Sequence, residues 1–286
     1  MSRIAYVNGA YLPMVDAVVN IEDRGYQFSD GVYEGITVYK GSLVDLGPHI
    51  DRLWRSLGEL EIAAPMEKAP LGFVIREVVR RNHIKNGFVY LQVTRGVASR
   101  DHPFPAFAIP ALTITCKRLD IDAIEARARK GVAASSQPDM RWDRCDVKSI
   151  SLLPNILAKQ AARAAGAFEA MLIDDEGLVT EGSSTNIWMV SKTGELITRS
   201  TEDNILPGIT RAAVKALCAD HQIAITERAF TLEEAHKAAE LFLTSSTAGA
   251  MPIVTLDGKA IGDGKVGPIG LKLIDVYKKH MEDQVG

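Results

Sequence analysis

The chain contains the stretch Arg141-Trp142-Asp143-Arg144-Cys145-Asp146-Val147-Lys148-Ser149, in which Lys148 ends an extended segment just before a predicted helix. A lysine in this position is either a solvated surface amine or a nucleophile. Three later segments favour the nucleophile, because they supply one carboxylate and two sites suited to an anion: Thr180-Glu181-Gly182-Ser183-Ser184, Pro207-Gly208-Ile209-Thr210-Arg211 and Thr244-Ser245-Ser246-Thr247. An amine-reactive cofactor that carries a phosphate would need this combination.

The composition limits the class of protein. With 286 residues and 47% hydrophobic content, the chain is long enough for one large domain or two smaller ones. A net charge of -3 argues against a nucleic-acid binder that depends on a broad basic surface. The 3 cysteines form no C-x-x-C pair, and the 6 histidines lack the spacing of a metal site. We therefore expect neither a disulfide framework nor a bound metal.

The hydropathy pattern gives no sign of a membrane protein. The first residues lack an apolar segment of signal-peptide length, and no apolar stretch approaches the ~20 residues needed to cross a bilayer. We expect no membrane partner and, by default, a location in the reducing cytoplasm.

The N-terminal part of the chain mixes strands and helices. Asn8-Gly9 lies between two short apolar runs, which is a strong hairpin signal, and a second hairpin is expected around Lys40-Gly41. Pro48 opens a predicted helix whose apolar residues recur at core spacing. A further helix is expected over 70–85, and strands are expected over 88–95 and 111–117.

The C-terminal part begins after a charged, alanine-rich segment that has no strong apolar stripe. A helix should begin at Leu153-Pro154 and stop at Gly166, and Thr231-x-x-Glu234 forms a capping box. Other strands and helices are expected over 170–173, 178–180, 186–190, 210–220, 241–244 and 268–281. The predicted fold class is mixed α/β in two unequal domains: a smaller one at 1–120, a connection at 121–133 and a larger one at 134–286.

Two segments could bind a phosphate group. Pro207-Gly208-Ile209-Thr210 precedes a predicted helix, and the N–H groups and dipole of a helix N-terminus attract anions. Thr244-Ser245-Ser246-Thr247 places four hydroxyl groups after a predicted strand, and Arg52 could add a full positive charge. Each also has an ordinary explanation: Thr210 as a helix N-cap, the hydroxyl run as a polar turn, and Arg52 as an exposed helix residue.

Two further segments offer groups for a cofactor or substrate. Glu181 ends a predicted strand beside small residues, so it is either a surface acid or a partner for a protonated pyridine nitrogen such as that of pyridoxal phosphate. The loop from Arg95 to Pro105 carries Arg100 and His102. An arginine can bind a carboxylate through two parallel hydrogen bonds, whereas the alternative is a solvated loop.

The order of these segments resembles that of the fold-type IV pyridoxal-phosphate enzymes, and most closely their D-amino acid transaminase branch. The Lys148 and Glu181 segments mark the superfamily, whereas Tyr33 and Arg100-x-His102 indicate the D-amino acid branch. The similarity covers nearly the whole chain and includes Tyr6-Val7-Asn8-Gly9, Phe28-Ser29-Asp30-Gly31-Val32-Tyr33-Glu34, His49-Ile50-Asp51-Arg52-Leu53 and Asp263-Gly264-Lys265-Val266-Gly267. The resemblance implies two domains with pyridoxal 5'-phosphate between them, and a homodimer whose sites are completed across the subunit interface.

The resemblance also implies a role for each candidate residue. Lys148 would form a Schiff base with the cofactor and later move the substrate proton, and Glu181 would pair with the pyridine nitrogen. The other cofactor-binding residues would be Arg52, Ser183, Ile209, Thr210, Ser245 and Ser246. The substrate carboxylate would be bound by Tyr33 with Arg100 and His102 from the other subunit, and Arg141 would line the site. The implied reaction is ping-pong transfer of an amino group between D-amino acids, of the D-alanine and D-glutamate type, and 2-oxo acids.

Two stretches differ from the pattern of this branch. After Glu34 the chain reads Gly35-Ile36-Thr37, where D-amino acid transaminases carry bulkier or charged residues. After Thr247 it reads Ala248-Gly249-Ala250, which is similar to the (R)-amine transaminases. The substrate range is therefore open. The alternatives are a branched-chain L-amino acid transaminase, an (R)-amine transaminase, an aminodeoxychorismate lyase and a non-catalytic regulator that binds the cofactor.

Overall fold

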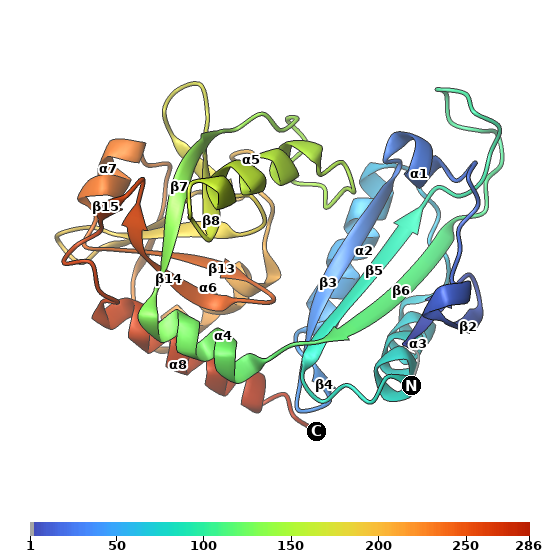
Figure 1. Cartoon of the computed structure of the whole chain (residues 1–286), viewed down its shortest axis with the longest axis horizontal. Helices are drawn as coiled ribbons and strands as arrows, with labels where there is room; N and C mark the ends of the chain where they lie inside the picture. The colour runs from blue at the N-terminus through green and yellow to red at the C-terminus, as the bar shows by residue number, and fades with distance from the viewer. Residues whose placement is uncertain (1–2) are drawn as a thin grey trace. The chain divides into compact units, whose positions relative to one another are not determined.

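The computed structural model describes residues 3–286, which form two compact units (Figure 1). Unit 1 comprises the described residues up to Asp120 together with Val147–Ser151 and Gln284–Gly286. Unit 2 comprises Ile121–Asp146 and Leu152–Asp283. Unit 1 is therefore assembled from three separate pieces of the chain, and the second piece carries Lys148.

An antiparallel sheet forms the centre of unit 1. Among the described residues, its six strands follow the order β2-β1-β6-β5-β3-β4. The Asn8-Gly9 hairpin is confirmed, because both residues have positive φ (45° and 101°) and Val7 pairs with Ala10. The strands are β1 Ile4–Val7, β2 Ala10–Pro13, β3 Gly31–Tyr39, β4 Ser42–Leu43, β5 Gly87–Thr94 and β6 Ala111–Arg118.

Two helices, α2 Leu46–Glu59 and α3 Lys68–Arg81, pack on one face of this sheet (Figure 1). Side chains alternate between the faces of a strand, and Val32 and Ile36 of β3 are fully buried in the core that these helices complete. Tyr33 consequently lies on the opposite face of β3. The remaining helical segments of unit 1 are the 3-10 turn η1 Met14–Asp16 and the short helix α1 Arg24–Phe28.

A mixed sheet forms the centre of unit 2. Within the described part of this unit, its nine strands follow the order β12-β11-β10-β13-β14-β7-β8-β9, with β15 beside β14. β7 is parallel to β8 and β14, and β11 is parallel to β12. The strands are β7 Val132–Pro138, β8 Glu169–Ile173, β9 Val179–Gly182, β10 Asn186–Val190, β11 Leu196–Thr198, β12 Ile225–Glu227, β13 Glu240–Ser245, β14 Gly249–Leu256 and β15 Lys259–Ala260.

The helices of unit 2 are α4 Ile121–Lys130, α5 Leu153–Ala164, α6 Ile209–Asp220, α7 Leu232–Lys237 and α8 Pro268–Glu282. Two predicted helix ends are confirmed in detail. α5 ends just before Gly166, which has a φ of 78°. Thr231 and Glu234 form the reciprocal hydrogen bonds of a capping box at α7. No helix within residues 3–286 combines the length and the hydropathy needed to cross a membrane.

The unit boundaries differ from the domain limits that we expected. Residues 121–133, interpreted as a connection, form α4 and the beginning of β7 and belong to unit 2. Ile124 and Ala128 of α4 pack against the core of that unit, which gives this charged helix an apolar side. Val147–Ser151 belongs to unit 1, although its place in the sequence suggested the C-terminal domain.

Candidate active site

The backbone around Lys148 is fixed against strand β3 of unit 1. The Lys148 carbonyl accepts a hydrogen bond from the Tyr33 N–H at 3.0 Å, and Ile150 N–H donates to the Gly31 carbonyl at 3.0 Å. Lys148 N–H donates to the Ser56 hydroxyl of α2 at 3.3 Å. These bonds hold Lys148 beside β3 although more than a hundred residues separate them in the chain.

The Lys148 amine lies over an aromatic side chain. Its Nζ is 4.3 Å from the centre of the Tyr33 ring, within the range of a cation–π interaction. The Tyr33 ring lies 5.6 Å from that of Tyr90, whose hydroxyl donates to Gln92 at 2.7 Å. Burial, together with the neighbouring Tyr33, raises the pKa of Tyr90 to about 12. The structure therefore brings together two of the predicted residues, Lys148 and Tyr33, within unit 1.

Arg52 is buried in an ionic cluster on the helix-covered face of the same sheet. Its guanidinium donates two hydrogen bonds to the Glu34 carboxylate, at 2.7 and 2.8 Å, and His49 Nδ1 lies 2.7 Å from that carboxylate. Burial alone would raise the pKa of Glu34, but Arg52 and His49 outweigh it and lower the pKa to about 2. The alternative of an exposed helix arginine is wrong, because Arg52 is only 8% exposed.

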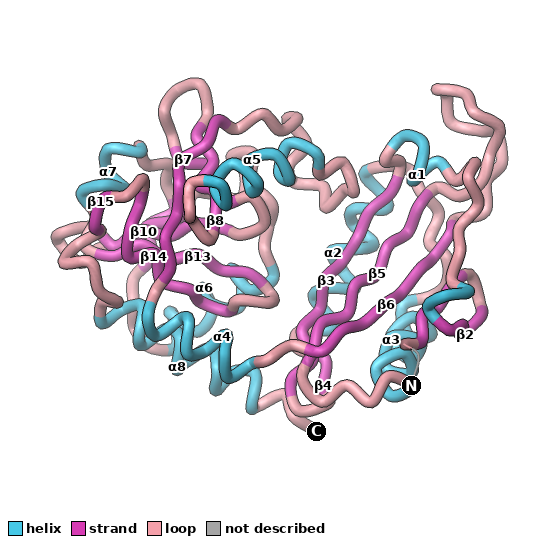
Figure 2. The backbone as a smooth tube through the Cα atoms, in the orientation of Figure 1, coloured by secondary structure: helices cyan, strands magenta, loops and turns pink. Residues whose placement is uncertain are grey.

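Arg100 and His102 lie in the long loop between β5 and β6 (Figure 2). Both residues are exposed, and both contact the ring of Phe28 in α1. The Arg100 guanidinium is 4.9 Å from the centre of that ring, and the His102 ring is 5.6 Å from it. Unit 1 thus fixes the two residues through an aromatic contact.

Glu181 is the centre of a buried polar network in unit 2. Its carboxylate accepts hydrogen bonds from Asn186 Nδ2 at 2.9 Å and from Leu206 N–H at 3.2 Å, and it contacts the Arg141 guanidinium. Asp139 holds Arg141 through two further bonds, at 2.7 and 2.8 Å. The alternative of a surface acid is wrong, because Glu181 is 4% exposed.

Charge balance in this network depends on Arg141. Burial opposes its positive charge, but the hydrogen bonds to Asp139 and the charge of Glu181 outweigh burial and raise the pKa of Arg141. The same arginine lowers the pKa of Asp139 against the effect of burial. Arg141 therefore stays charged between two carboxylates.

Ile209 and Thr210 begin helix α6. The N-cap is Gly208, which makes no side-chain capping bond, so the alternative of Thr210 as the N-cap is wrong. A Cβ on Gly208 would lie 2.0 Å from Asn186 Oδ1. Glycine at this position lets the helix N-terminus approach Asn186 closely, and Asn186 also bonds to Glu181.

The three predicted serines lie in different surroundings within unit 2. The Ser183 hydroxyl donates to the buried carboxylate of Glu169, which also pairs with Lys159. Ser245 ends β13, and its hydroxyl accepts from Ala248 N–H at 3.2 Å in the turn that contains Ser246. The structure gives Ser183 a hydrogen bond inside the unit, whereas Ser245 and Ser246 form a turn.

The two unusual glycines both have a packing role. A Cβ on Gly35 would lie 2.5 Å from the Phe88 ring, so that ring covers Gly35 on the Tyr33 face of the sheet. Gly249 has a φ of 59°, and a Cβ there would lie 2.9 Å from the Tyr277 ring of α8. Close packing therefore explains why small residues stand at these positions.

Sequence reasoning gave no role to several polar residues that contact the predicted ones, among them Glu34, His49, Asp139 and Asn186. Asp139 and Arg141 are two residues apart, so a local pairing could have been inferred from their charges. The partnership of Glu34 with His49 and Arg52 had no local signal, because the residues lie on a strand and a helix that meet only through folding.

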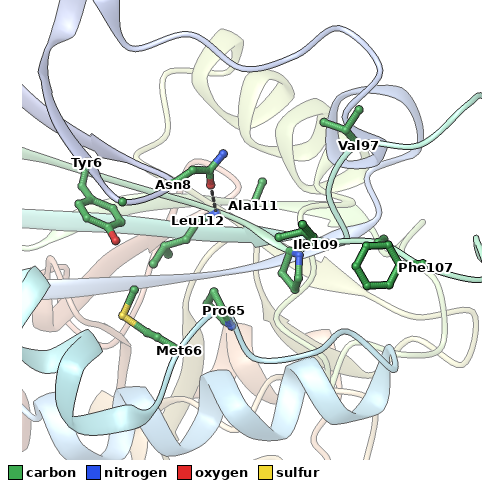
Figure 3. Close-up of a pocket in the computed structure, with 12 residues that line it drawn as sticks. Tyr6, Asn8, Pro65, Met66, Val97, Phe107, Ile109, Ala111 and Leu112 are labelled. Carbon is green, nitrogen blue, oxygen red and sulfur yellow. Dashed lines mark hydrogen bonds between the residues drawn. The ribbon is translucent and has the colours of Figure 1, made fainter.

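Unit 1 has a hollow that none of these residues lines (Figure 3). It has a volume of about 590 Å³ and an edge where Leu112 N–H donates to the Asn8 side chain at 2.7 Å. None of the predicted site residues lines it. The lining residues are Tyr6, Asn8, Gly9, Pro65, Met66, Val97, Phe107, Ala108, Ile109, Pro110, Ala111 and Leu112.

Comparisons with known proteins agree on one family. The model of the family described as amino-transferase class IV matches residues 31–256. A D-alanine aminotransferase of Bacillus licheniformis is 44% identical over 92% of this chain and 91% of its own, and one of Staphylococcus haemolyticus is 38% identical over 98% of both.

Solved structures of branched-chain aminotransferases have the same fold. One such enzyme, from T.th. and with pyridoxamine 5'-phosphate, has a TM-score of 0.93 at 26% identity, covering 100% of this chain and 96% of its own. The enzyme of Thermoproteus uzoniensis with norvaline has a TM-score of 0.89 at 26% identity, covering 99% of this chain and 96% of its own.

Proposed function

The chain belongs to the class IV aminotransferases, and from this membership we propose that it transfers amino groups between D-amino acids and 2-oxo acids. The relatives named D-alanine aminotransferase support D-alanine as a substrate, since their identity exceeds that of the branched-chain enzymes, and D-glutamate is the second substrate that we propose. The observation that carries the proposal is the Lys148 amine, held beside β3 and over the Tyr33 ring.

The residues present fit pyridoxal 5'-phosphate. The donor set comprises a lysine amine, a buried carboxylate, a buried arginine and a helix N-terminus whose N-cap is a glycine. We propose that Lys148 holds the aldehyde and Glu181 the pyridine nitrogen. The phosphate-binding residues would be Arg52, Ile209, Thr210, Ser245 and Ser246, with Ser183 beside them.

When bound, this cofactor withdraws electrons from the substrate α-carbon and so makes its proton removable. Lys148 Nζ then takes that proton and returns it, as a general base followed by a general acid. The Glu181 carboxylate keeps a proton on the ring nitrogen, while Asn186 and Leu206 N–H hold the carboxylate in place. Arg141 lines the site, where it pairs with Glu181 and lowers the pKa of Asp139.

The substrate carboxylate supplies the second point of recognition. We propose that Tyr33 binds it together with Arg100 and His102 donated by the other subunit of a homodimer. Arginine binds carboxylates through two parallel charged hydrogen bonds, so this arrangement favours amino acids over simple amines. The same groups would bind the 2-oxo acid in the second half of a ping-pong reaction.

Replacement of the central lysine tests the proposal. Lys148→Ala should lower transamination between D-alanine and 2-oxoglutarate by more than about 10⁴-fold, because nucleophile and general base are lost together. Lys68→Ala is the matched control. Lys68 is an exposed residue of α3, and its amine also lies over an aromatic ring, that of Trp54 in α2. Near-native turnover in the Lys148 variant would refute the assignment.

A panel of amino donors separates the alternatives. Keto-acid formation from D-alanine and D-glutamate, but not from L-leucine or a simple (R)-amine, supports the proposal. A protein that accepted only L-amino acids would be a branched-chain type enzyme, and one that accepted only amines would be an amine transaminase. A protein that released pyruvate from aminodeoxychorismate over many turnovers without a 2-oxo acceptor would be a lyase, whereas a transaminase without an acceptor stops after one half-reaction.

A further inference from the structure

The loop that carries Arg100 and His102 has little structure of its own. Residues 98–110, all of them among the described residues, form neither helix nor strand. Arg100 and His102 are both exposed, so burial of their side chains does not hold them in place. Any fixed geometry at these residues must come from neighbouring parts of unit 1.

Arg24, the first residue of α1, supplies the polar contacts to this loop. It is 3% exposed, and its guanidinium donates to the Asp101 carbonyl at 2.6 Å and to the His102 carbonyl at 3.2 Å. Its Nε donates to the Asp30 carboxylate at 2.8 Å. A buried arginine thus binds the carbonyl oxygens of two consecutive loop residues, Asp101 and His102.

Asp30 connects this arginine to the body of unit 1. The carboxylate also accepts two hydrogen bonds from Arg95, at 2.7 and 3.1 Å. Arg95 in turn donates to the carbonyls of Leu60 and Glu61, which follow α2. One carboxylate between two guanidinium groups leaves positive charge in excess, which favours the carbonyl oxygens of the loop as further acceptors.

Phe28, at the end of α1, supplies the side-chain contact. Its ring centre lies 4.8 Å from the Arg24 guanidinium and 4.9 Å from the Arg100 guanidinium, and the His102 ring is 5.6 Å away. α1 packs closely on the sheet, because a Cβ on Gly25 would lie 2.2 Å from the Thr94 side chain of β5, and the Thr94 hydroxyl donates to the N-cap residue Asp23 at 2.9 Å. The helix is therefore anchored to the sheet beside the loop.

We propose that Arg24 is a positioning residue, which with Asp30 and Phe28 holds the 98–110 loop so that Arg100 and His102 can bind a substrate carboxylate. In this role Arg24 touches no substrate atom. Its loss should weaken carboxylate binding while the proton transfer by Lys148 proceeds. The inference rests on the proposed role of Arg100 and His102, and the experiment separates the two.

The experiment measures the first half-reaction with D-alanine in single-turnover mode, on the enzyme loaded with cofactor. The dependence of rate on D-alanine concentration gives a dissociation constant and a limiting rate. In Arg24→Met the dissociation constant should rise about ten- to hundredfold, as expected for loss of charged hydrogen bonds, with little change in the limiting rate. Arg24→Lys should recover part of the binding, because one charged donor remains. Arg80→Met, on the surface of α3, is the control.

A double-mutant cycle tests whether Arg24 acts through the loop. If it does, Arg24→Met should raise the dissociation constant by a smaller factor in Arg100→Met than in the parent protein, because Arg100 is one of the two residues that Arg24 positions. Hydrogen exchange of the cofactor-free protein gives an independent readout. Exchange over residues 98–110 should become faster in Arg24→Met, while exchange in α3 stays unchanged.

The outcomes are distinguishable. Unchanged D-alanine binding in Arg24→Met, or additive effects with Arg100→Met, would overturn the positioning role while the role of Arg100 stands. Unchanged binding in Arg100→Met would overturn the carboxylate site itself, and the inference with it. If Arg24→Met does not fold, Phe28→Leu provides a second test, because it keeps the buried ion pair of Arg24 with Asp30. This variant should still bind D-alanine more weakly than the parent protein. Binding equal to that of the parent protein would refute the inference.

Discussion

The buried carboxylate of Glu34 should make a large, pH-dependent contribution to the stability of unit 1. Its pKa lies at about 2, against the ordinary value of 4.5, because Arg52 and His49 outweigh the cost of burial. One pKa unit corresponds to about 1.4 kcal/mol, so the ionised carboxylate stabilises the folded state by about 3 kcal/mol. Glu34→Gln also leaves Arg52 buried without a counter-charge, which costs about 3–5 kcal/mol in comparable pairs.

The sign of the pH dependence follows from the lowered pKa. Stabilisation by Glu34 is complete above pH 4.5 and disappears as the pH falls through about 2. The difference in unfolding free energy between the parent protein and Glu34→Gln should therefore be largest at pH 7. At pH 3 the carboxylate contribution should fall to about half its value at pH 7.

Urea unfolding, followed by circular dichroism at pH 7, 5 and 3, measures this difference. Glu233→Gln is the control, because Glu233 has a lowered pKa from its bond to Lys237 but its side chain is 76% exposed. Solvent screens that pair, so its replacement should leave the unfolding free energy nearly unchanged. The reasoning would be refuted if the unfolding free energies of the parent protein and Glu34→Gln differed by less than about 1 kcal/mol at pH 7. It would also be refuted if that difference did not become smaller at low pH.

Two further predictions concern unit 2. Glu181→Gln should lower the single-turnover rate with D-alanine by about 10²-fold or more, because an amide cannot keep a proton on the pyridine nitrogen, and a rate equal to that of the parent protein would exclude this role. Gly249→Ala should lower the thermal unfolding midpoint more than Gly258→Ala. Both glycines have positive φ, but only at Gly249 would a Cβ meet a neighbour, the Tyr277 ring at 2.9 Å. Equal midpoints in the two variants would show that Tyr277 moves aside without cost.

Local patterns in the sequence were sufficient for several of the strands and helices and for some of their ends. Asn8-Gly9 defines a hairpin because both residues tolerate positive φ, and Thr231 with Glu234 closes a helix turn over three residues. The apolar residues that recur after Pro48 also predicted α2 from local information, because their spacing depends only on neighbouring turns of one helix. The segment after Asp120 was misread because charged residues and alanine concealed the side on which Ile124 packs.

The sequence by itself determined the family of this protein and the chemical character of its candidate residues: an amine at Lys148, a carboxylate at Glu181 and an arginine at Arg52. The tertiary structure decided their partners. Arg52 meets Glu34 across 18 residues of chain, and Arg24 meets the Asp101 carbonyl across 77. Burial removes water from such charges, and only packed elements can then supply the compensating groups, so no local pattern specifies which residue will pair with which.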